Sequence, residues 1–360
     1  MEPNSRNKQR HRKILGIERD DYTGTIQRYR DKKNISYKLK DGKEVFAKYV
    51  SDQGNGAINN LEGIRNEVEI LHKLEDTEIT PKVIQFKEYP SHKKARLVTE
   101  KVSGTSLDRL TITESEKETI IENCILSTAT SLQIIHERGI YIVDINEGTF
   151  LVNQNGEDCK IVDFEFAIDS SNTSENQLAV ALNFRKPLKY KSLDYPIPLT
   201  VENVQRKEMY IWAKTMLDFI AKIYKLGDLI EMEIPLENIP QEEREKIQEE
   251  VTRIREKIMP EIIEKATRYT QKEEIVIKIK SAFERRHNPS QTFEEFVNEQ
   301  IIKESEKTAS KIINTVIIKL TLRHKLEKFG IKIPSKIISF LERCLDLDPN
   351  NRPNSFNDIL

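Results

Sequence analysis

The chain of 360 residues has no run that approaches the roughly 18 consecutive apolar residues of a membrane-spanning helix, so we expect no membrane insertion. Neither sign of charge dominates. The 58 basic and 59 acidic residues give a formal net charge of −1, which argues against a nucleic-acid binder and its large one-sign field. Cysteine is scarce and scattered. Three isolated thiols in apolar stretches indicate reduced core residues of a cytoplasmic protein, not disulfides or a zinc site: Cys124, Cys159 and Cys344.

The N-terminal segment Met1–Lys13 lacks an apolar signal and is polar and basic. We expect a disordered, solvated tail, with targeting to the nucleus or to an anionic surface as the alternative. Charged residues make up 32% of the chain and hydrophobic residues 37%, which indicates a well-solvated protein with a modest core. The length is sufficient for two lobes or two domains.

The N-terminal part of the chain reads as strands around one helix. Strands are expected over residues 35–39, 44–50, 83–89 and 95–102, because apolar and polar residues alternate there or turn signals bound the runs. A helix is expected over residues 61–74. Its apolar stripe, at spacings of three and four, consists of Leu61, Ile64, Val68 and Leu71.

Helical patterns dominate after a break at Ser103–Thr105. We expect helices over residues 114–136, 206–224, 293–328 and 335–345. Highly charged helical stretches fill residues 226–333, and one of them has apolar residues at helical spacing: Ile247, Val251, Ile254 and Ile258. Core packing explains such a stripe more often than partner docking, which stays open as the alternative.

Two aspartates stand inside otherwise apolar runs, Asp144 and Asp163, 19 positions apart. Burying a carboxylate is unfavourable unless a cation or hydrogen-bond donors meet it. Between the two aspartates, residues 150–152 and 159–162 flank a turn signal and predict a hairpin that keeps the carboxylates near one another. Such a pair suits Mg²⁺ binding and activation of a hydroxyl, although either aspartate alone reads as an ordinary turn residue.

A lysine and a glutamate in the N-terminal part are likewise charged residues at positions where apolar side chains are expected. Strand alternation places Lys48 on the same face as Phe46 and Val50, where apolar side chains point. Glu67 falls within the apolar stripe of its helix rather than opposite it. A Lys48–Glu67 pair explains both anomalies together, whereas a solvated lysine and a stray glutamate need separate explanations.

In order and spacing these residues resemble the protein kinase family over nearly the whole chain. The matching elements are Val45–Lys48, Glu67, Glu100–Val102, Asp144 and Asp163–Phe164, with an ending at Leu341–Pro353 similar to the last helices of eukaryotic-type kinases. The resemblance implies a two-lobed α+β protein kinase-like fold. Residues 14–102 would form a small β-rich N-lobe and residues 103–360 a larger helical C-lobe, in which 226–333 contain a helical insertion.

Carried over to this chain, the resemblance implies ATP and Mg²⁺ as cofactors. Lys48 would hold the α- and β-phosphates, with Glu67 fixing its side chain. The other nucleotide-binding residues would be Thr99, Glu100, Val102 and Ser106. Asp144 would accept or orient the proton of the substrate hydroxyl, and Asp163 and Thr149 would hold the metal. Arg352 would anchor the activation segment through a buried ion pair, with Glu202 as the expected partner.

The chain also departs from the family. No Gly-x-Gly-x-x-Gly precedes Lys48, and Arg28–Asn34 stands in its place, so a close backbone approach to phosphates is not expected. Ile142–Val143 replaces His-Arg before Asp144, which removes the arginine through which activation-loop phosphorylation acts. Activity should therefore not depend on that switch.

Three further departures fall near the expected metal and catalytic loop. Thr149 stands where a metal-binding asparagine is expected, and its hydroxyl is a shorter, less polarised ligand. Glu165 replaces the glycine after Asp163–Phe164, where it either adds a carboxylate near the metal or is solvated. Tyr210 stands where kinases place an aspartate that braces the catalytic loop.

The sequence thus predicts ATP- and Mg²⁺-dependent phosphoryl transfer to serine or threonine of a protein substrate by a divergent kinase. One alternative is a pseudokinase that serves as an interaction module with weak or no catalysis. Another is an atypical small-molecule kinase. The helical insertion is a candidate docking site for a protein partner, and we expect neither nucleic-acid binding nor membrane insertion.

Overall fold

The computed structural model of the chain contains two compact units, and each is described by itself. The first contains the described residues of Met1–Lys191, Ile197–Ile223 and Pro353–Leu360, and the second those of Ser192–Pro196 and Tyr224–Arg352. The structure describes residues 27–28, 34–39, 42–51, 60–142, 144–171, 201–226, 239–270, 273–286, 291–346 and 349–360. The expected tail at 1–13 and most of the segment 28–34 lie outside these residues.

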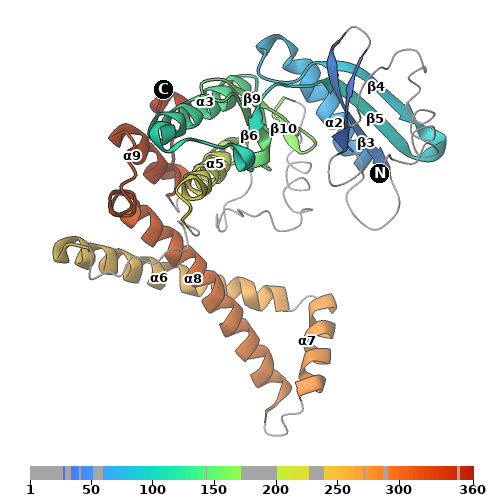
Figure 1. Cartoon of the computed structure of the whole chain (residues 1–360). Helices are drawn as coiled ribbons and strands as arrows, with labels where there is room; N and C mark the ends of the chain where they lie inside the picture. The colour runs from blue at the N-terminus through green and yellow to red at the C-terminus, as the bar shows by residue number, and fades with distance from the viewer. Residues whose placement is uncertain are drawn as a thin grey trace, which may run out of the picture. The chain divides into compact units, whose positions relative to one another are not determined.

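An antiparallel sheet of order β1-β2-β3-β5-β4 begins the first unit (Figure 1). Its strands are β1 (Gln27–Arg28), β2 (Asn34–Lys38), β3 (Glu44–Ser51), β4 (Val83–Tyr89) and β5 (Lys94–Glu100). Gly42, at φ +87°, supplies the left-handed backbone that the turn between β2 and β3 requires. The β3–β5 register pairs Phe46 with Thr99 and Lys48 with Leu97, which places the predicted lysine opposite the middle of β5.

Helix α2 (Asn60–Lys73) packs against the sheet. Its buried face includes Ile64, Val68 and Leu71, as the apolar spacing predicted. Glu67 is only 6% exposed on that same face. A charged side chain is thus held inside the junction of helix and sheet.

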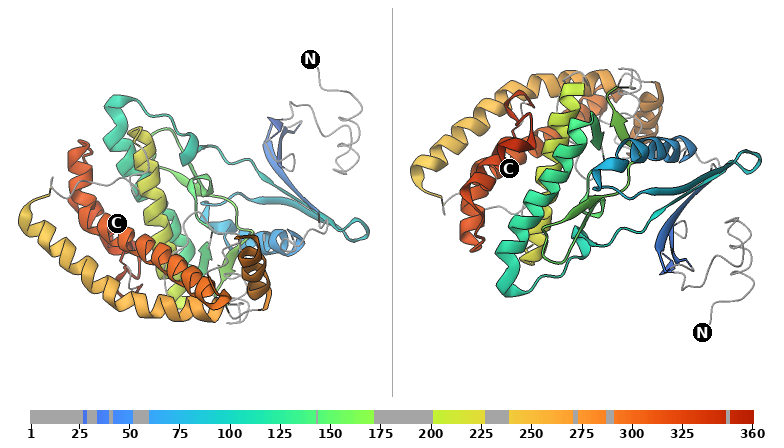
Figure 2. Two further views of the ribbon diagram at one scale, coloured as in Figure 1. Left: turned by 90° about the horizontal axis from the view of Figure 1, so that it is seen from below. Right: turned by 90° about the horizontal axis from the view of Figure 1, so that it is seen from above.

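Helices α3 (Lys117–Glu137) and α5 (Val201–Ile223) lie side by side in the rest of the first unit (Figure 2). Trp212 on α5 is fully buried, and its ring meets that of Phe356 edge-on at 4.9 Å between centroids. The C-terminal residues are therefore part of this core. Helix α5 begins at Val201, five residues before the predicted start, because the polar residues there gave no periodic signal.

Short strands connect the helices to the middle of the first unit. Strands β6 (Thr105–Ser106), β8 (Phe150–Val152) and β9 (Cys159–Ile161) form one sheet, and β8 and β9 make the predicted hairpin. A second pair joins β7 (Ile140–Ile142) to β10 (Ala167–Asp169). Both aspartates singled out in the sequence lie at the ends of these strands.

The second unit is helical, as expected for residues 226–333. It contains α6 (Gln241–Thr270), α7 (Glu273–Arg286), α8 (Phe293–Lys328) and α9 (Ser335–Cys344). Helices α6 and α8 cross and pack against each other, and α7 connects the end of α6 to the start of α8 (Figures 1 and 2). A capping box between Thr292 and Glu295 starts α8.

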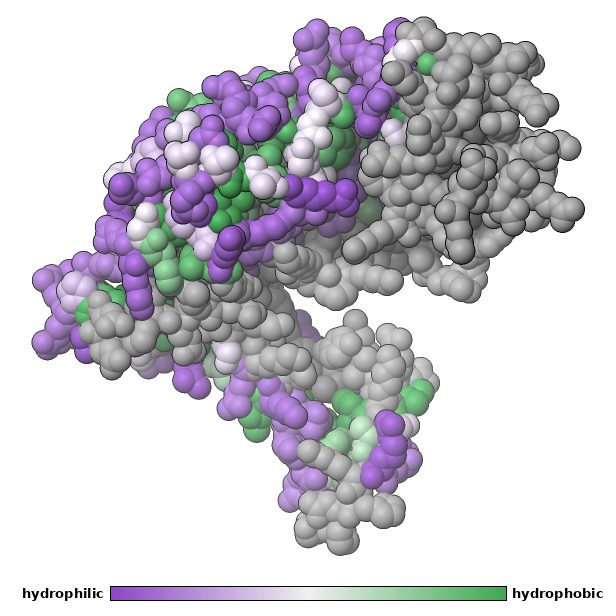
Figure 3. All heavy atoms as spheres, viewed as in Figure 1, coloured by the Kyte–Doolittle hydropathy of each residue, from purple (hydrophilic) through white to green (hydrophobic). Residues whose placement is uncertain are grey.

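The predicted stripe on α6 is used for packing inside this unit. Ile247 is buried, and Ile254 and Ile258 pack against Ile262 and Ala309. Hydrophobic atoms also show at the α7 end of the unit (Figure 3), where Ile277 is 60% exposed. A partner that docks on the insertion stays a prediction. No helix within the described ranges is long and apolar enough to cross a membrane.

Candidate active site

A cleft of about 830 Å³ opens in the first unit between β3, α2, β5, the linker after β5, and the segment that follows β9. Seven of the nine predicted site residues line it: Lys48, Glu67, Thr99, Glu100, Val102, Ser106 and Asp163. Asp144 and Thr149 are not among the lining residues. Apolar surface in the lining comes from Phe46, Leu151 and Val162. The cleft therefore offers a slot that combines apolar surface with polar groups.

The linker after β5 presents backbone groups to this slot. The N–H of Glu100 donates to the carbonyl of Lys82 at 2.9 Å, and that of Lys101 donates to the carbonyl of Glu44 at 3.0 Å. Within the described part of the chain, no hydrogen bond uses the N–H of Val102. A heterocycle in the slot can accept that hydrogen bond.

The ammonium of Lys48 is surrounded by three carboxylates. It lies 2.9 Å from Glu67, 3.0 Å from Asp163 and 2.7 Å from Glu165. Lys48 and Glu67 are mostly buried, whereas the Asp163 side chain is 53% exposed. One ammonium does not balance three carboxyl groups, so a net negative charge remains around Lys48.

This arrangement changes the protonation of the group. Burial alone would lower the pKa of Lys48, but Glu67, Asp163 and Glu165 together outweigh it and raise that pKa, so the ammonium stays charged. For Glu67, burial is the largest cause and raises its pKa; the neighbouring Asp163 and Glu165 add to the effect, and Lys48 opposes it. The cleft thus holds a permanent cation beside a carboxyl that gives up its proton reluctantly.

Asp163 has an unusual backbone. Its φ of +72° lies in the left-handed region, which aspartate tolerates better than most residues but which still costs about 1 kcal/mol or more. The turn that follows is closed by a hydrogen bond from the N–H of Ala167 to the carbonyl of Phe164, at 3.0 Å. Local strain of this kind persists only where surrounding contacts hold it in place.

The oxygen atoms near Lys48 fit a hard divalent cation. One carboxylate oxygen each from Glu67, Asp163 and Glu165 lies within 4.8 Å of the others, and carboxylate oxygens are preferred ligands of Mg²⁺. The hydroxyl of Thr149 is engaged elsewhere. It accepts a hydrogen bond from the N–H of Asn146 at 3.1 Å, and Thr149 is 1% exposed. Asp163 and Glu165 thus lie close enough together to share a cation. The ligand role of Thr149 stays a prediction.

Asp144 begins a tight loop directly after β7. The amide of Asn146 donates to the carbonyl of Asp144 at 3.2 Å and accepts from the N–H of Gly148 at 2.9 Å. With the contact from its own N–H to Thr149, Asn146 forms a capping box that starts a 3₁₀ turn at Glu147. Asn146 and Thr149 thus shape the loop that carries Asp144.

A buried glutamate that the sequence reasoning did not select supports this loop. Glu208 on α5 accepts a hydrogen bond from the N–H of Ile142 at 3.0 Å and lies 3.2 Å from the ring of His136. Burial raises the pKa of Glu208, and the contacts to His136 and Ile142 oppose the shift. Tyr210, which stands where kinases place the bracing aspartate, is also fully buried. The sequence contains a signal for this role, because Glu208 is an acidic residue among the apolar residues of the helix that carries Trp212.

Arg352 lies in the second unit. Its Nε donates to the carbonyl of Asp346 at 2.7 Å, and the residue is 3% exposed. The side chain of Glu202, its expected partner, lies outside the described residues. The anchoring role of Arg352 stays a prediction.

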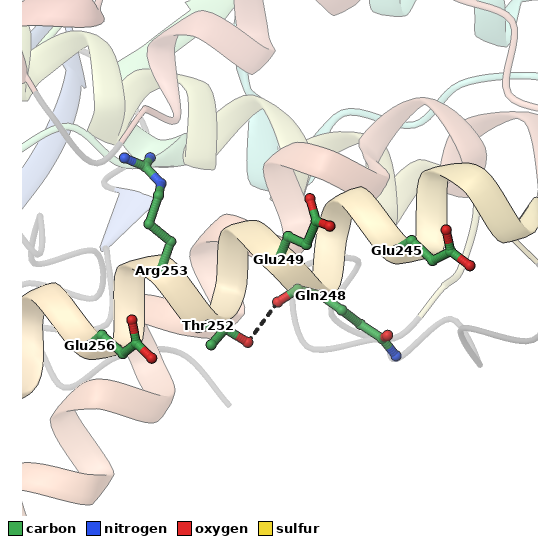
Figure 4. A pocket seen from close by; sticks show the side chains of 6 residues that line it. All are labelled: Glu245, Gln248, Glu249, Thr252, Arg253 and Glu256. Carbon is green, nitrogen blue, oxygen red and sulfur yellow. Dashed lines mark hydrogen bonds between the residues drawn. The ribbon is translucent and has the colours of Figure 1, made fainter.

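A second hollow, of about 520 Å³, lies on the surface of α6 (Figure 4). It is lined by Glu245, Gln248, Glu249, Thr252, Arg253 and Glu256. All project from one helix, and Thr252 bonds only to the carbonyl of Gln248, at 2.8 Å. Arg253 is paired with Glu250. These are the solvated side chains of a charged helix face, and we assign no site to them.

Comparison with known proteins agrees with this geometry. Residues 34–196 match the family model of the protein kinase domain, so the chain carries a domain of the protein kinase-like superfamily. The predicted kinase-like fold and family resemblance are confirmed. No curated protein matches the chain. Among solved structures, the kinase PK-1 of Cydia pomonella granulovirus is similar at 12% identity and a TM-score of 0.47, over 99% of this chain and 97% of that one.

Proposed function

We propose that this protein transfers the γ-phosphoryl group of ATP, with Mg²⁺, to serine or threonine of a protein substrate. The observation that carries the proposal is the contact of Lys48 with both Glu67 and Asp163 inside an apolar cleft. A scaffold has no need of a buried Lys48–Glu67 ion pair, whereas phosphoryl transfer requires a cation held where phosphates bind. Three buried thiols that form no disulfide support our further expectation of a reducing, cytoplasmic environment.

The nucleotide would enter with its base in the slot. Phe46 and Leu151 would cover the faces of the adenine, and the N–H of Val102 and the carbonyl of Glu100 would form hydrogen bonds with its edge. Thr99 would lie at the back of the slot, and Ser106 near the ribose. Lys48 would then exchange part of its carboxylate contact for the α- and β-phosphates.

Asp163 and Glu165 would hold Mg²⁺. When bound, the ion supplies charge neutralisation for the phosphates. The residues of the chain supply positioning: Glu67 keeps Lys48 extended, and the loop of Asn146 and Thr149 orients Asp144. Asp144 would accept or orient the hydroxyl proton while the hydroxyl oxygen bonds to the γ-phosphorus and ADP leaves.

Two rival functions are separated by one set of measurements. Nucleotide binding is followed by thermal shift with Mg²⁺ and ATP, and transfer by labelled ATP with the chain itself and a generic protein as acceptors. Asp144→Asn should keep the thermal shift and abolish transfer. A wild-type protein with no shift at millimolar ATP is a pseudokinase or a non-binder. Transfer only to small hydroxyl compounds would support the small-molecule alternative.

A further inference from the structure

Helix α2 faces the segment from Asp163 to Ser171 over three turns. Gly63, Asn66 and Lys73 are three and seven residues apart, so they lie on one face of the helix. Each contacts that segment: Gly63 at Glu165, Asn66 at Phe164–Ala167, and Lys73 at Asp169 and Ser171. The contact is continuous and does not include Glu67, which points to Lys48.

Asn66 is the centre of this contact. Its Nδ2 lies 2.8 Å from the carbonyl oxygen of Ala167, 3.3 Å from that of Phe164 and 3.4 Å from that of Glu165. Three acceptors around one atom fix the orientation of the amide, since only the NH₂ group can face them. The half-buried Asn66 side chain therefore donates hydrogen bonds to the carbonyl groups of the turn that follows Asp163.

Lys73 closes the other end. Its ammonium pairs with the carboxylate of Asp169, of which the side chain is 9% exposed, and lies 3.0 Å from the hydroxyl of Ser171. Asp169 in turn accepts from the N–H of Ser171 at 3.0 Å and from its hydroxyl at 2.7 Å. The charged pair ties the last turn of α2 to the end of β10.

Between these two points the backbones approach closely. A Cβ added at Gly63 would lie 3.6 Å from both the Cβ and the carbonyl oxygen of Glu165. A long side chain at this position would separate the helix from the segment. The absence of one allows Asn66 to reach the carbonyls.

The segment that Asn66 and Lys73 contact lies next to Asp163, Glu67 and the strand that leads to Asp144. Asp163, with its left-handed backbone, directly precedes Phe164. Glu67 follows Asn66 on α2. On the far side, β10 pairs Ala167 with Ile142, the end of the strand that leads to Asp144.

We propose that Asn66 and Lys73 are positioning residues, which together form an α2 clasp that holds Phe164–Ser171 and so fixes Asp163 relative to Lys48 and Asp144. The inference deepens the proposed function and rests on it for its catalytic consequence. The α2 clasp consists of side chains of the protein itself, so we expect it to form without bound nucleotide and without phosphorylation.

Hydrogen exchange of the nucleotide-free protein tests the clasp without any activity. Asn66→Asp keeps the shape of the side chain but replaces both donors with oxygen, and Lys73→Met removes the cation at a position that is 40% exposed. Each should raise exchange in peptides over 163–171 by tenfold or more and leave β4 unchanged. Arg65→Ala is the matched control, because Arg65 neighbours Asn66 but pairs with Glu88 on β4. Unchanged exchange over 163–171 in both variants would overturn the proposal.

Kinetics separate positioning from simple stabilisation. If the clasp positions Asp163, kcat should fall at least tenfold in Asn66→Asp and in Lys73→Met at a temperature where both are folded. Asn66→Gln, which keeps the donor, should recover part of the loss. Loosened exchange with wild-type kcat would refute the positioning role. A wild-type chain without transfer refutes the proposed function instead, and the exchange result still decides whether the clasp holds the segment.

Discussion

The carboxylate of Glu208 accepts a hydrogen bond from the backbone N–H of Ile142, at 3.0 Å, in the interior of the first unit. Ile142 is the last residue of β7, two positions before Asp144. Glu208 is fully buried and also meets His136. The orientation of the loop that carries Asp144 is thus coupled to α5 through one side chain.

Removal of this side chain should be strongly destabilising. Glu208→Ala leaves the N–H of Ile142 and the ring of His136 without their partner, and a loss of about 3 kcal/mol or more in the free energy of unfolding is expected. Glu208→Gln keeps an acceptor and should lose less. Urea denaturation measures both. Asp76→Asn, which breaks the exposed pair with Arg138, is the control and should change the midpoint little.

Metal binding should depend on Glu165 more than on Thr149. Glu165→Gln is expected to weaken Mg²⁺ binding about tenfold, which corresponds to about 1.4 kcal/mol. Thr149→Val removes the acceptor of the Asn146 N–H, so it should lower stability by about 1–3 kcal/mol while the folded protein keeps its metal affinity. Calorimetric titration with a non-hydrolysable ATP analogue present distinguishes the two. The opposite order of effects would return the ligand role to Thr149.

Gly63 can be replaced by alanine but not by a long side chain. The new Cβ would make ordinary contacts with Glu165, and alanine favours the helix, so Gly63→Ala should raise the free energy of unfolding by about 0.5–1 kcal/mol. Gly63→Leu should lower it, because the side chain must displace Glu165. Thermal denaturation of both variants provides the measurement, and a destabilised Gly63→Ala would show that the helix lies closer to the segment than described.

The contribution of Asp169 should disappear in acid. Burial alone would raise the pKa of Asp169, but hydrogen bonds from Lys73 and Ser171 outweigh it and hold that pKa below its ordinary value. A lowered pKa in the folded state means that the carboxylate stabilises the protein above its ordinary pKa, and that the effect is lost as the pH falls through the lowered value. The stability difference between wild type and Asp169→Asn should therefore be constant near neutral pH and shrink below about pH 4.

Activity should survive treatment with a phosphatase. Valine replaces arginine at position 143, and the contacts from Asn66 and Lys73 to the segment after Asp163 require no phosphate. Transfer by dephosphorylated protein, verified by mass spectrometry, should match that of the untreated protein. A tenfold loss on dephosphorylation, restored by rephosphorylation, would disprove this expectation.

Long helices with periodic apolar residues, and pairs of opposite charges placed among apolar residues, could be predicted from the sequence. The apolar stripe of α2 indicates which side of the helix is buried. A glutamate within that stripe requires a cation, and Lys48 is the cation that the structure places beside it. The hairpin of β8 and β9 followed from a turn signal between two apolar runs. In each case the deciding information lies within a few residues.

The remaining details depend on how far side chains extend and on their hydrogen bonds to backbone groups, which the spacing of residues in the sequence does not reveal. Thr149 is predicted as a metal ligand, and spacing does not reveal that its hydroxyl also accepts a hydrogen bond from the backbone N–H of Asn146, three residues earlier. The position that aligns with the bracing aspartate of kinases carries Tyr210, and spacing does not reveal that Glu208, half a turn earlier on α5, reaches the backbone of β7 with its carboxylate. Asn66 gave no signal, since its partners are carbonyl groups.

The three carboxylates around Lys48 also bear on the order in which ligands arrive. Even where Glu67 keeps its proton, one ammonium cannot neutralise both Asp163 and Glu165, so this part of the cleft repels a bare polyphosphate before any contact with the base is made. A nucleotide that brings its own divalent cation reverses the sign of that interaction at Asp163 and Glu165. We therefore expect the cleft to select the metal-complexed nucleotide from solution, with an association rate that falls when magnesium is chelated.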